Sequence, residues 1–322
     1  MTVEVIICSS RHIINMPLHC EVGLTSMQTR VRLWFGFLAL LVVSGATLQA
    51  QEPDDRDPRT SEKAVYTLFH PTPRESMREM STDRPDQTES PYTVDAGHFQ
   101  LEMDLVSTVL DRERIGGDDV MTEIWNVAPI NLKMGLLNNV DLQLMLDTYV
   151  HSRVQDDSIR HVTQISGFGD VTTRLKINFW GNDGGKTAFA FLPFVKWPLP
   201  KSGLRNGKTE GGLIIPMAVD LAKGWDMGVM TEFDFVADDA GGYDTEFINS
   251  LTVGHGLTDN VRMYLEFFTV TGSAPEFRWQ GQVDVGWTYA LRENVQLDCG
   301  CNFGVTRSAP DFGPFAGLSF RF

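Results

Sequence analysis

The chain has 322 residues, of which 42% are hydrophobic and 21% are charged, a composition that supports a folded protein and argues against long-range disorder. Its 27 Lys and Arg residues face 42 Asp and Glu residues, a formal net charge of -15, so we expect no binding of nucleic acid through its phosphates. With 29 Gly, 20 Phe and only 4 Cys, the chain is not a disulfide-rich scaffold. The composition favours an all-β protein.

The N-terminal region has the pattern of an export signal. Two arginines precede an apolar run, residues 33–43, and Ala50 stands before an acidic stretch, an arrangement typical of a secretory signal peptide. The run is shorter than the roughly 18 to 20 residues of a membrane-spanning helix, so an uncleaved anchor is the weaker alternative. Met27 would give a signal of ordinary length. We therefore predict that residues 1–26 are an upstream extension and that residues 27–50 are the signal peptide.

The remaining chain divides into two parts. Residues 51–96 are rich in Pro, Asp, Glu, Arg and Thr and show no periodicity, which predicts a periplasmic N-terminal segment with little regular structure. Across residues 97–322, apolar and polar residues alternate in twelve successive runs, of which residues 171–179 are the cleanest. This period of two is expected of strands with one apolar and one polar face.

The connections between these runs indicate how the strands are arranged. Short, turn-like connections such as residues 136–139 alternate with longer, acidic ones such as residues 153–167. Outer-membrane barrels have short periplasmic turns and longer extracellular loops, whereas a secreted β-sandwich, the alternative, has no reason to alternate in this way. We predict one all-β domain over residues 97–322: a transmembrane antiparallel up-and-down β-barrel of about twelve strands in the outer membrane, in contact with lipid and lipopolysaccharide.

Two motifs carry a resemblance to a known family. Residues 81–91, with the sequence STDRPDQTESP, resemble the opening motif of the bacterial outer-membrane family named for the meta pathway of phenol degradation, whose members are labelled transporters. Residues 167–171, with the sequence GFGDV, resemble the central motif of that family. The resemblance extends from about residue 81 to the C-terminus. It implies a barrel that passes small solutes, hydrophobic or aromatic ones among them, and it brings no set of substrate-binding residues.

The C-terminus predicts a partner. The chain ends in Phe322, with Phe320 at the alternate position before it. This ending resembles the signal by which barrel-assembly machinery recognises its clients. The alternative is an ordinary last strand, which would show the same alternating pattern.

The polar face of each strand is expected to point into the lumen. Acids outnumber bases on this face, which favours passage of cations or neutral solutes over anions; the alternative is a set of ion pairs that brace a narrow barrel. The lumen candidates are Glu102, Asp104, Asp141, Asp147, Asp170, Arg174, Lys176, Glu232, Asp234, Arg262, Glu266, Asp284 and Asp298.

The charged segment before the first strand is a candidate plug. We predict that residues 82–89 fold back into the periplasmic mouth, where their charges meet Arg174, Lys176 or Arg262; a solvated linker is the alternative. The plug candidates are Asp83, Arg84, Pro85, Asp86 and Glu89.

No pattern in the sequence indicates an enzyme, a cofactor or a metal site. The histidines stand in no nucleophile motif. Cys299 and Cys301 lack a second pair that would complete a zinc site. Acidic doublets such as Asp156–Asp157 are read as solubilising loop charge and not as Ca²⁺ ligands that bridge lipopolysaccharide. The sequence predicts a passive channel for small solutes, and the alternative is a closed structural or adhesive barrel.

Overall fold

A computed structural model describes residues 63–115, 118–198, 204, 207–238 and 240–322. The predicted upstream extension and signal peptide lie outside these residues. A short 3-10 helix, η1 (Arg74–Ser76), precedes the strands. The strands are β1 (Phe99–Ile115), β2 (Asp118–Val127), β3 (Ile130–Leu137), β4 (Val140–Leu146), β5 (Tyr149–Asp156), β6 (His161–Gly167), β7 (Val171–Trp180), β8 (Thr187–Trp197), β9 (Glu210–Asp220), β10 (Trp225–Ala237), β11 (Tyr243–Gly256), β12 (Val261–Gly272), β13 (Gln280–Arg292), β14 (Val295–Gly304) and β15 (Phe312–Arg321).

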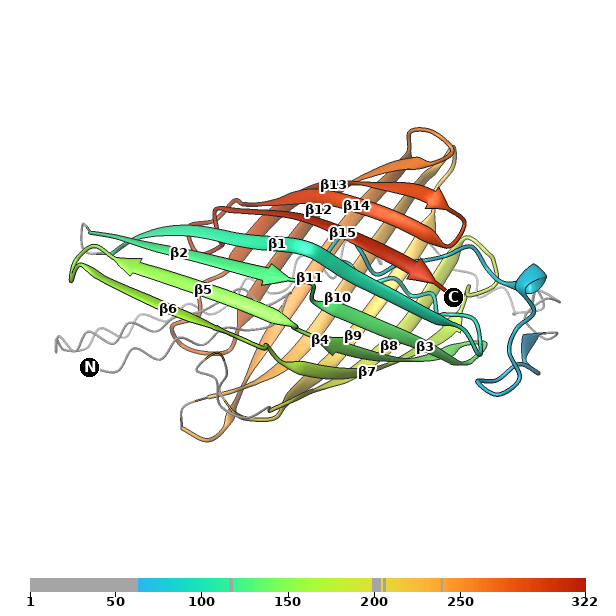
Figure 1. Ribbon diagram of the computed structural model, residues 1–322, viewed down its shortest axis with the longest axis horizontal. Coiled ribbons are helices and arrows are strands. Elements are labelled where there is room, and N and C mark those ends of the chain that lie inside the picture. Colours follow the sequence, from blue (N-terminus) through green and yellow to red (C-terminus); the bar gives the residue numbers. More distant parts are fainter. Residues whose placement is uncertain (1–62, 116–117, 199–203, 205–206, 239) are drawn as a thin grey trace, which may run out of the picture.

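The strands form one closed antiparallel barrel (Figure 1). β2 and β3 are two halves of one long strand, because β1 pairs with both of them. β4 with β5 and β6 with β7 are halves of long strands in the same way, so the fifteen strands make twelve around the barrel. Pairing of β15 with β1 closes the ring. The predicted fold and strand number are confirmed. No helix in the described ranges has the length and apolar character needed to cross a membrane.

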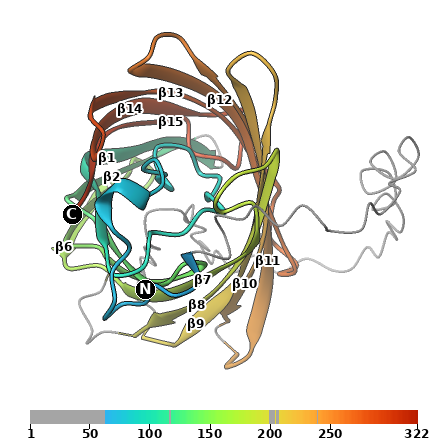
Figure 2. The ribbon, with the colours of Figure 1, turned by 90° about the vertical axis from the view of Figure 1, so that its right-hand side faces the viewer.

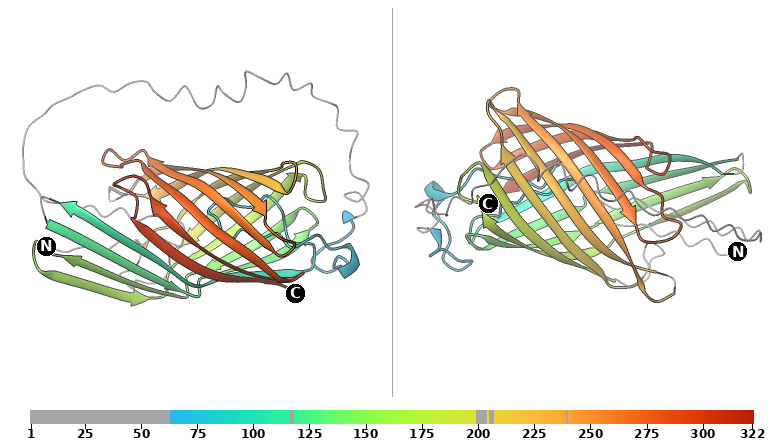
Figure 3. Two further views of the ribbon diagram at one scale, coloured as in Figure 1. Left: turned by 90° about the horizontal axis from the view of Figure 1, so that it is seen from above. Right: turned by 180° about the vertical axis from the view of Figure 1, so that it is seen from behind.

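The interruptions of the three long strands lie side by side and form a kink across the sheet. Ala128, with a φ of 53°, separates β2 from β3, and the Thr148 hydroxyl donates to its carbonyl at 2.8 Å. The next interruption contains Gly169, whose amide donates to the Asp147 carbonyl at 2.7 Å. A Cβ on Gly169 would overlap the Asp147 side chain. Beyond the kink, β2, β5 and β6 extend past the barrel (Figures 1 and 3).

Side chains alternate between the lumen and the outer surface. In β7 the burial pattern alternates from Val171 to Phe179, with Arg174 and Lys176 buried and Phe179 54% exposed. Lipid-facing side chains are exposed on an isolated barrel, so burial identifies the inward face. Trp180, Trp197 and Trp225 stand exposed at strand ends.

Candidate functional site

Residues 81–96 lie inside the barrel and form the candidate site, here called the plug. Figure 2 looks into the end of the barrel near the C-terminus, and the cyan segment that precedes β1 lies within the ring of strands, whereas the blue residues before it lie outside this end in Figure 1. This is the end with the short connections between strands, and we call it the turn end. The plug leads into β1 through Gly97, whose φ of +78° suits glycine and whose Cβ would meet Pro71 at 2.7 Å. Residues 81–96, which belong to the segment predicted to have little regular structure, contain no helix or strand and lie against the inner wall.

Asp83 joins the plug to two lysines of the wall. Its carboxylate lies 2.5 Å from Lys176 Nζ on β7 and 2.5 Å from Lys133 Nζ on β3. Lys133 also pairs with Glu102 on β1, and Glu102 accepts a hydrogen bond from the Asp83 amide at 3.1 Å. Burial by itself raises the pKa of Asp83, but the charges of Lys133 and Lys176 outweigh it and hold the pKa well below its ordinary value. All four side chains are buried, so each charge depends on the others for compensation.

Arg84 reaches a second part of the wall, formed by β1 and β14. Its guanidinium donates to Asp298 on β14 at 2.7 Å and pairs with Asp104 on β1. Burial lowers the pKa of Arg84, and the two carboxylates raise it by more, so Arg84 stays charged. Its guanidinium also lies over the Phe315 ring, 5.9 Å from the centroid. Gly317 leaves room for this side chain, because a Cβ there would overlap the guanidinium.

Two further contacts hold the middle of the plug. Glu89 pairs with Arg174 of β7 at 2.5 Å. The Thr88 hydroxyl lies 2.6 Å from the Ser250 hydroxyl of β11. The predicted meeting of the plug with Lys176 and Arg174 is therefore observed. Arg262 does not take part and pairs with Asp226 near the turn end.

Asp95 anchors the last part of the plug, and the sequence did not single it out. Its carboxylate is fully buried and lies 3.3 Å from Arg78, 3.5 Å from Arg321 and 3.6 Å from Lys63. Gly135 on β3 approaches the backbone here so closely that a Cβ would overlap the Asp95 carbonyl. The sequence feature that could have identified Asp95 is its place two residues before Gly97, where the chain turns into β1.

The structure places most of the predicted lumen residues on the buried inner wall. Asp141 accepts a hydrogen bond from the Val94 amide at 3.0 Å. Asp147 and Asp170 lie at the kink and are only partly buried, and Arg262 is exposed. The buried members are Glu102, Asp104, Asp141, Arg174, Lys176, Glu232, Asp234, Glu266, Asp284 and Asp298. Whether they set ion selectivity stays a prediction.

Part of the inner wall is apolar, which alternation alone does not predict. Seven buried side chains on β8 to β12 form one cluster, none more than 4% exposed. Met230 links this cluster to the plug, because its sulfur accepts from the Glu89 amide at 3.4 Å. The members are Ala190, Leu192, Ile214, Met230, Ile248, Phe268 and Val270, here called the apolar patch.

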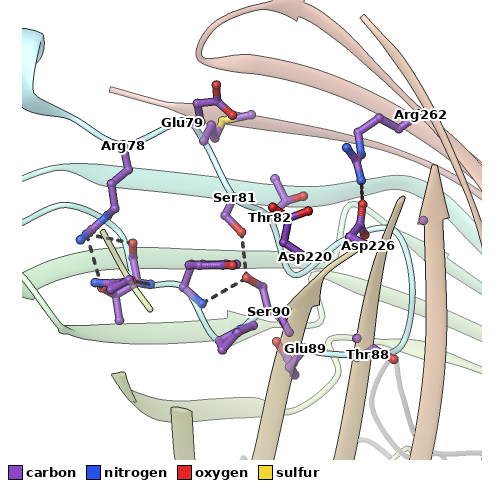
Figure 4. A pocket seen from close by; sticks show the side chains of 18 of the residues that line it. Arg78, Glu79, Ser81, Thr82, Thr88, Glu89, Ser90, Asp220, Asp226 and Arg262 are labelled. Atoms are coloured by element: carbon purple, nitrogen blue, oxygen red, sulfur yellow. Dashed lines mark hydrogen bonds and ion pairs between the residues drawn. The ribbon is translucent and has the colours of Figure 1, made fainter. Parts of the chain in front are cut away.

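A cavity of about 1060 Å³ lies between the plug and the wall at the turn end. Figure 4 shows plug residues such as Ser81 and Thr82 on one side, and Asp220, Asp226 and Arg262 of the wall on the other. Pro85 lines this cavity too. Within the described ranges, no group of three or more His, Cys, Asp or Glu side chains is arranged to hold a metal ion.

The predicted assembly signal lies where the barrel closes. The Phe322 ring stacks on Phe99 of β1 with centroids 5.7 Å apart, and the Phe320 ring lies 5.8 Å from that of Phe322. Recognition by assembly machinery stays a prediction.

Comparison with known proteins agrees with this architecture. A family model described as "Putative MetA-pathway of phenol degradation" matches residues 82–322, and no curated protein matches the chain. Among solved structures, an outer-membrane channel of Pseudomonas putida F1 is similar over 75% of this chain and 100% of its own, with 11% identity and a TM-score of 0.53. The translocator domain of the Neisseria meningitidis autotransporter NalP is similar over 70% and 88%, with 8% identity and a TM-score of 0.47. The monoaromatic hydrocarbon channel CymD is similar over 70% and 87%, with 9% identity and a TM-score of 0.41. The first of these likenesses shows a shared outer-membrane barrel fold.

Proposed function

The chain belongs to the family described as "Putative MetA-pathway of phenol degradation", and from this membership we propose that it is an outer-membrane channel through which small solutes, including hydrophobic or aromatic compounds, pass passively. The solved channel of Pseudomonas putida F1, which has the same fold, supports this proposal. The single observation that carries it is a closed barrel whose lumen is occupied by a polar plug and lined in part by the apolar patch.

The manner in which the plug is held supports a channel. A permanently filled barrel would be stabilised best by apolar packing, because replacing buried ion pairs by apolar groups is often neutral or stabilising. Here the plug is attached by ion pairs from Asp83, Arg84 and Glu89, and a cavity lies beside it. Displacing the plug would break these polar contacts, which water could replace, and would uncover the side of the plug that meets Met230.

The apolar patch supports a hydrophobic solute. Lumens of water-filled barrels are polar, and an inward apolar surface is costly to hydrate. Leu192, Ile214 and Ile248 nevertheless face inward, each 1% exposed or less. An aromatic solute that reaches this surface when the plug moves would be stabilised by contact with it. The acidic side chains around it, such as Glu232 and Asp234, would disfavour anions.

Current blockade tests this proposal. The purified protein is folded in detergent and reconstituted into planar bilayers, and benzyl alcohol or glycerol is added as a neutral aromatic or polar solute. We expect benzyl alcohol to interrupt the current and glycerol to have a much smaller effect. Ile248→Asn should weaken the blockade, whereas the conservative control Ile248→Val should retain it. Equal effects of the two solutes, or blockade that Ile248→Asn leaves unchanged, would contradict a role for the apolar patch.

A further inference from the structure

One row of the inner wall carries an oxygen-bearing side chain on four adjacent strands. Across β11, β12, β13 and β14, Thr252 stands opposite Glu266, Glu266 opposite Asp284, and Asp284 opposite Asn302. Glu266 is 1% exposed and Asp284 is fully buried. The plug covers this row, since Glu266 accepts hydrogen bonds from the Gln87 amide at 2.7 Å and the Thr88 amide at 2.8 Å.

The two carboxylates of this row differ from the others that hold the plug. Asp83, Glu89 and Asp298 each lie against a Lys or Arg side chain. Among the residues that the structure describes, neither Glu266 nor Asp284 forms an ion pair with a Lys or Arg side chain; the two carboxyl groups contact each other, and Asp284 also contacts the Phe303 backbone. Buried carboxylates without a compensating positive charge are strongly unfavourable. Their charge is therefore neutralised by a proton or by a bound cation.

A second observation favours a cation. The Tyr264 side chain is only 6% exposed, and its hydroxyl has no hydrogen-bond partner in the described part of the chain. The carboxylates of Asp86, Glu266, Asp284 and Asp298 all act on this hydroxyl electrostatically. The Thr252 hydroxyl, on a side chain 7% exposed, is also without a partner there. These neutral oxygens beside two carboxylates are available as ligands.

We propose that Glu266, Asp284 and the Tyr264 hydroxyl bind a divalent hard cation, Ca²⁺, between the wall and the plug. A divalent ion matches the two negative charges of Glu266 and Asp284. Because the available donors are all oxygens, hard cations are preferred over soft ones. Ca²⁺ accepts an irregular shell of six to eight oxygens, whereas Mg²⁺ requires near-octahedral geometry and gives up its water reluctantly.

The ion would couple to the plug through Glu266. This carboxylate accepts from the Gln87 and Thr88 amides, and a bound cation keeps it ionised. An ionised carboxylate is the stronger hydrogen-bond acceptor, so Ca²⁺ would hold the plug more firmly. This site is independent of the proposed solute, and its test does not require the channel to conduct.

Isothermal titration calorimetry on the folded full-length protein in detergent, after treatment with a chelator, tests the site with CaCl₂ as the probe. We expect saturable binding of one ion per chain, and weaker binding of MgCl₂. Asp284→Asn should abolish saturable binding, and Tyr264→Phe, which removes only the hydroxyl, should weaken it several-fold. Asp259→Asn, in an exposed turn, is the matched control and should bind as the unmodified chain does.

Each outcome decides the proposal. Loss in Asp284→Asn with retention in Asp259→Asn supports the site. If Asp284→Asn fails to fold, as judged by heat-dependent mobility in gels, weakened binding in Tyr264→Phe supports it instead. If Glu266 and Asp284 share a proton instead, no saturable Ca²⁺ binding is seen between pH 6 and 8, and this result overturns the proposal. Ca²⁺ binding that neither substitution changes also overturns it. Equal binding of Mg²⁺ overturns the choice of Ca²⁺.

Discussion

Asp83 Oδ1 lies 2.5 Å from Lys176 Nζ, and both side chains are fully buried inside the barrel. Lys133 Nζ lies at the other oxygen of the same carboxylate, also at 2.5 Å. One acid of the plug thus compensates two bases of the wall. Removing one member of such a buried pair generally costs about 3–5 kcal/mol, because the remaining charge is left without a partner.

Asp83→Asn should therefore release the plug. The substitution keeps the shape of the side chain but leaves Lys133 and Lys176 with less negative charge nearby, so the docked state becomes less favourable. We expect larger and more frequent current steps in planar bilayers. The control is Glu79→Gln, which changes an exposed acid near the plug and should leave the steps as they are. Unchanged conductance in Asp83→Asn would show that this carboxylate does not hold the plug closed.

Gly135→Ala should displace the plug by a steric route. A Cβ at Gly135 would overlap the Asp95 carbonyl, which is backbone and has little freedom to move aside. We expect a rise in conductance comparable with that of Asp83→Asn. Gly256→Ala is the matched control, because its Cβ would meet nothing within 4 Å. Equal conductance of the two alanine variants would argue against close docking of residues 94–95.

The Asp83 contribution to docking should be insensitive to pH near neutrality. Because the pKa of Asp83 is held below its ordinary value, its contribution is fully present above the unfolded value of about 3.9. It is lost only as the pH falls through the lowered value in the folded protein. The difference in conductance between the unmodified chain and Asp83→Asn should therefore stay constant from pH 8 to about pH 5. A difference that disappears within this range would contradict the assignment.

A disulfide should lock the plug. The hydroxyls of Thr88 and Ser250 are 2.6 Å apart, which is compatible with the short separation that a disulfide requires. We expect Thr88→Cys combined with Ser250→Cys to lose large openings when oxidised and to regain them under reducing agent. Thr88→Cys alone is the control for the effect of one added thiol. Openings that persist in the oxidised double variant would show that conduction does not need plug movement at Thr88.

Much of the fold could be predicted from the sequence, because the alternation of apolar and polar residues can be seen within each single strand. Residues such as Arg174 and Lys176 take their inward direction from the period of the strand, and both are buried. The kink at Ala128 and Gly169 could not be placed in this way. It depends on hydrogen bonds between neighbouring strands, which no single run of residues specifies.

The ion pairs of the candidate site could be predicted from the sequence, because charged residues are visible in it. The apolar contacts could not, because they depend on how the strands pack. The charged motif around Asp83 and Glu89 predicted contact with Lys176 and Arg174, and these contacts are present. The apolar patch was missed because β8 and β9 are apolar on both faces, so Leu192 and Ile214 do not stand out as inward residues. Of the three bases named as alternative contacts of the plug, Arg262 pairs with Asp226 of the wall.

Conductance tests the central claim, that the barrel is a channel held closed by its plug, most directly. The purified protein and its Asp83→Asn variant are folded in detergent, verified by heat-dependent gel mobility and reconstituted into planar bilayers with a salt gradient. We predict current steps with a reversal potential that shows cation selectivity, larger in the variant than in the unmodified chain. Silence from both folded proteins would contradict the account and favour a closed structural barrel.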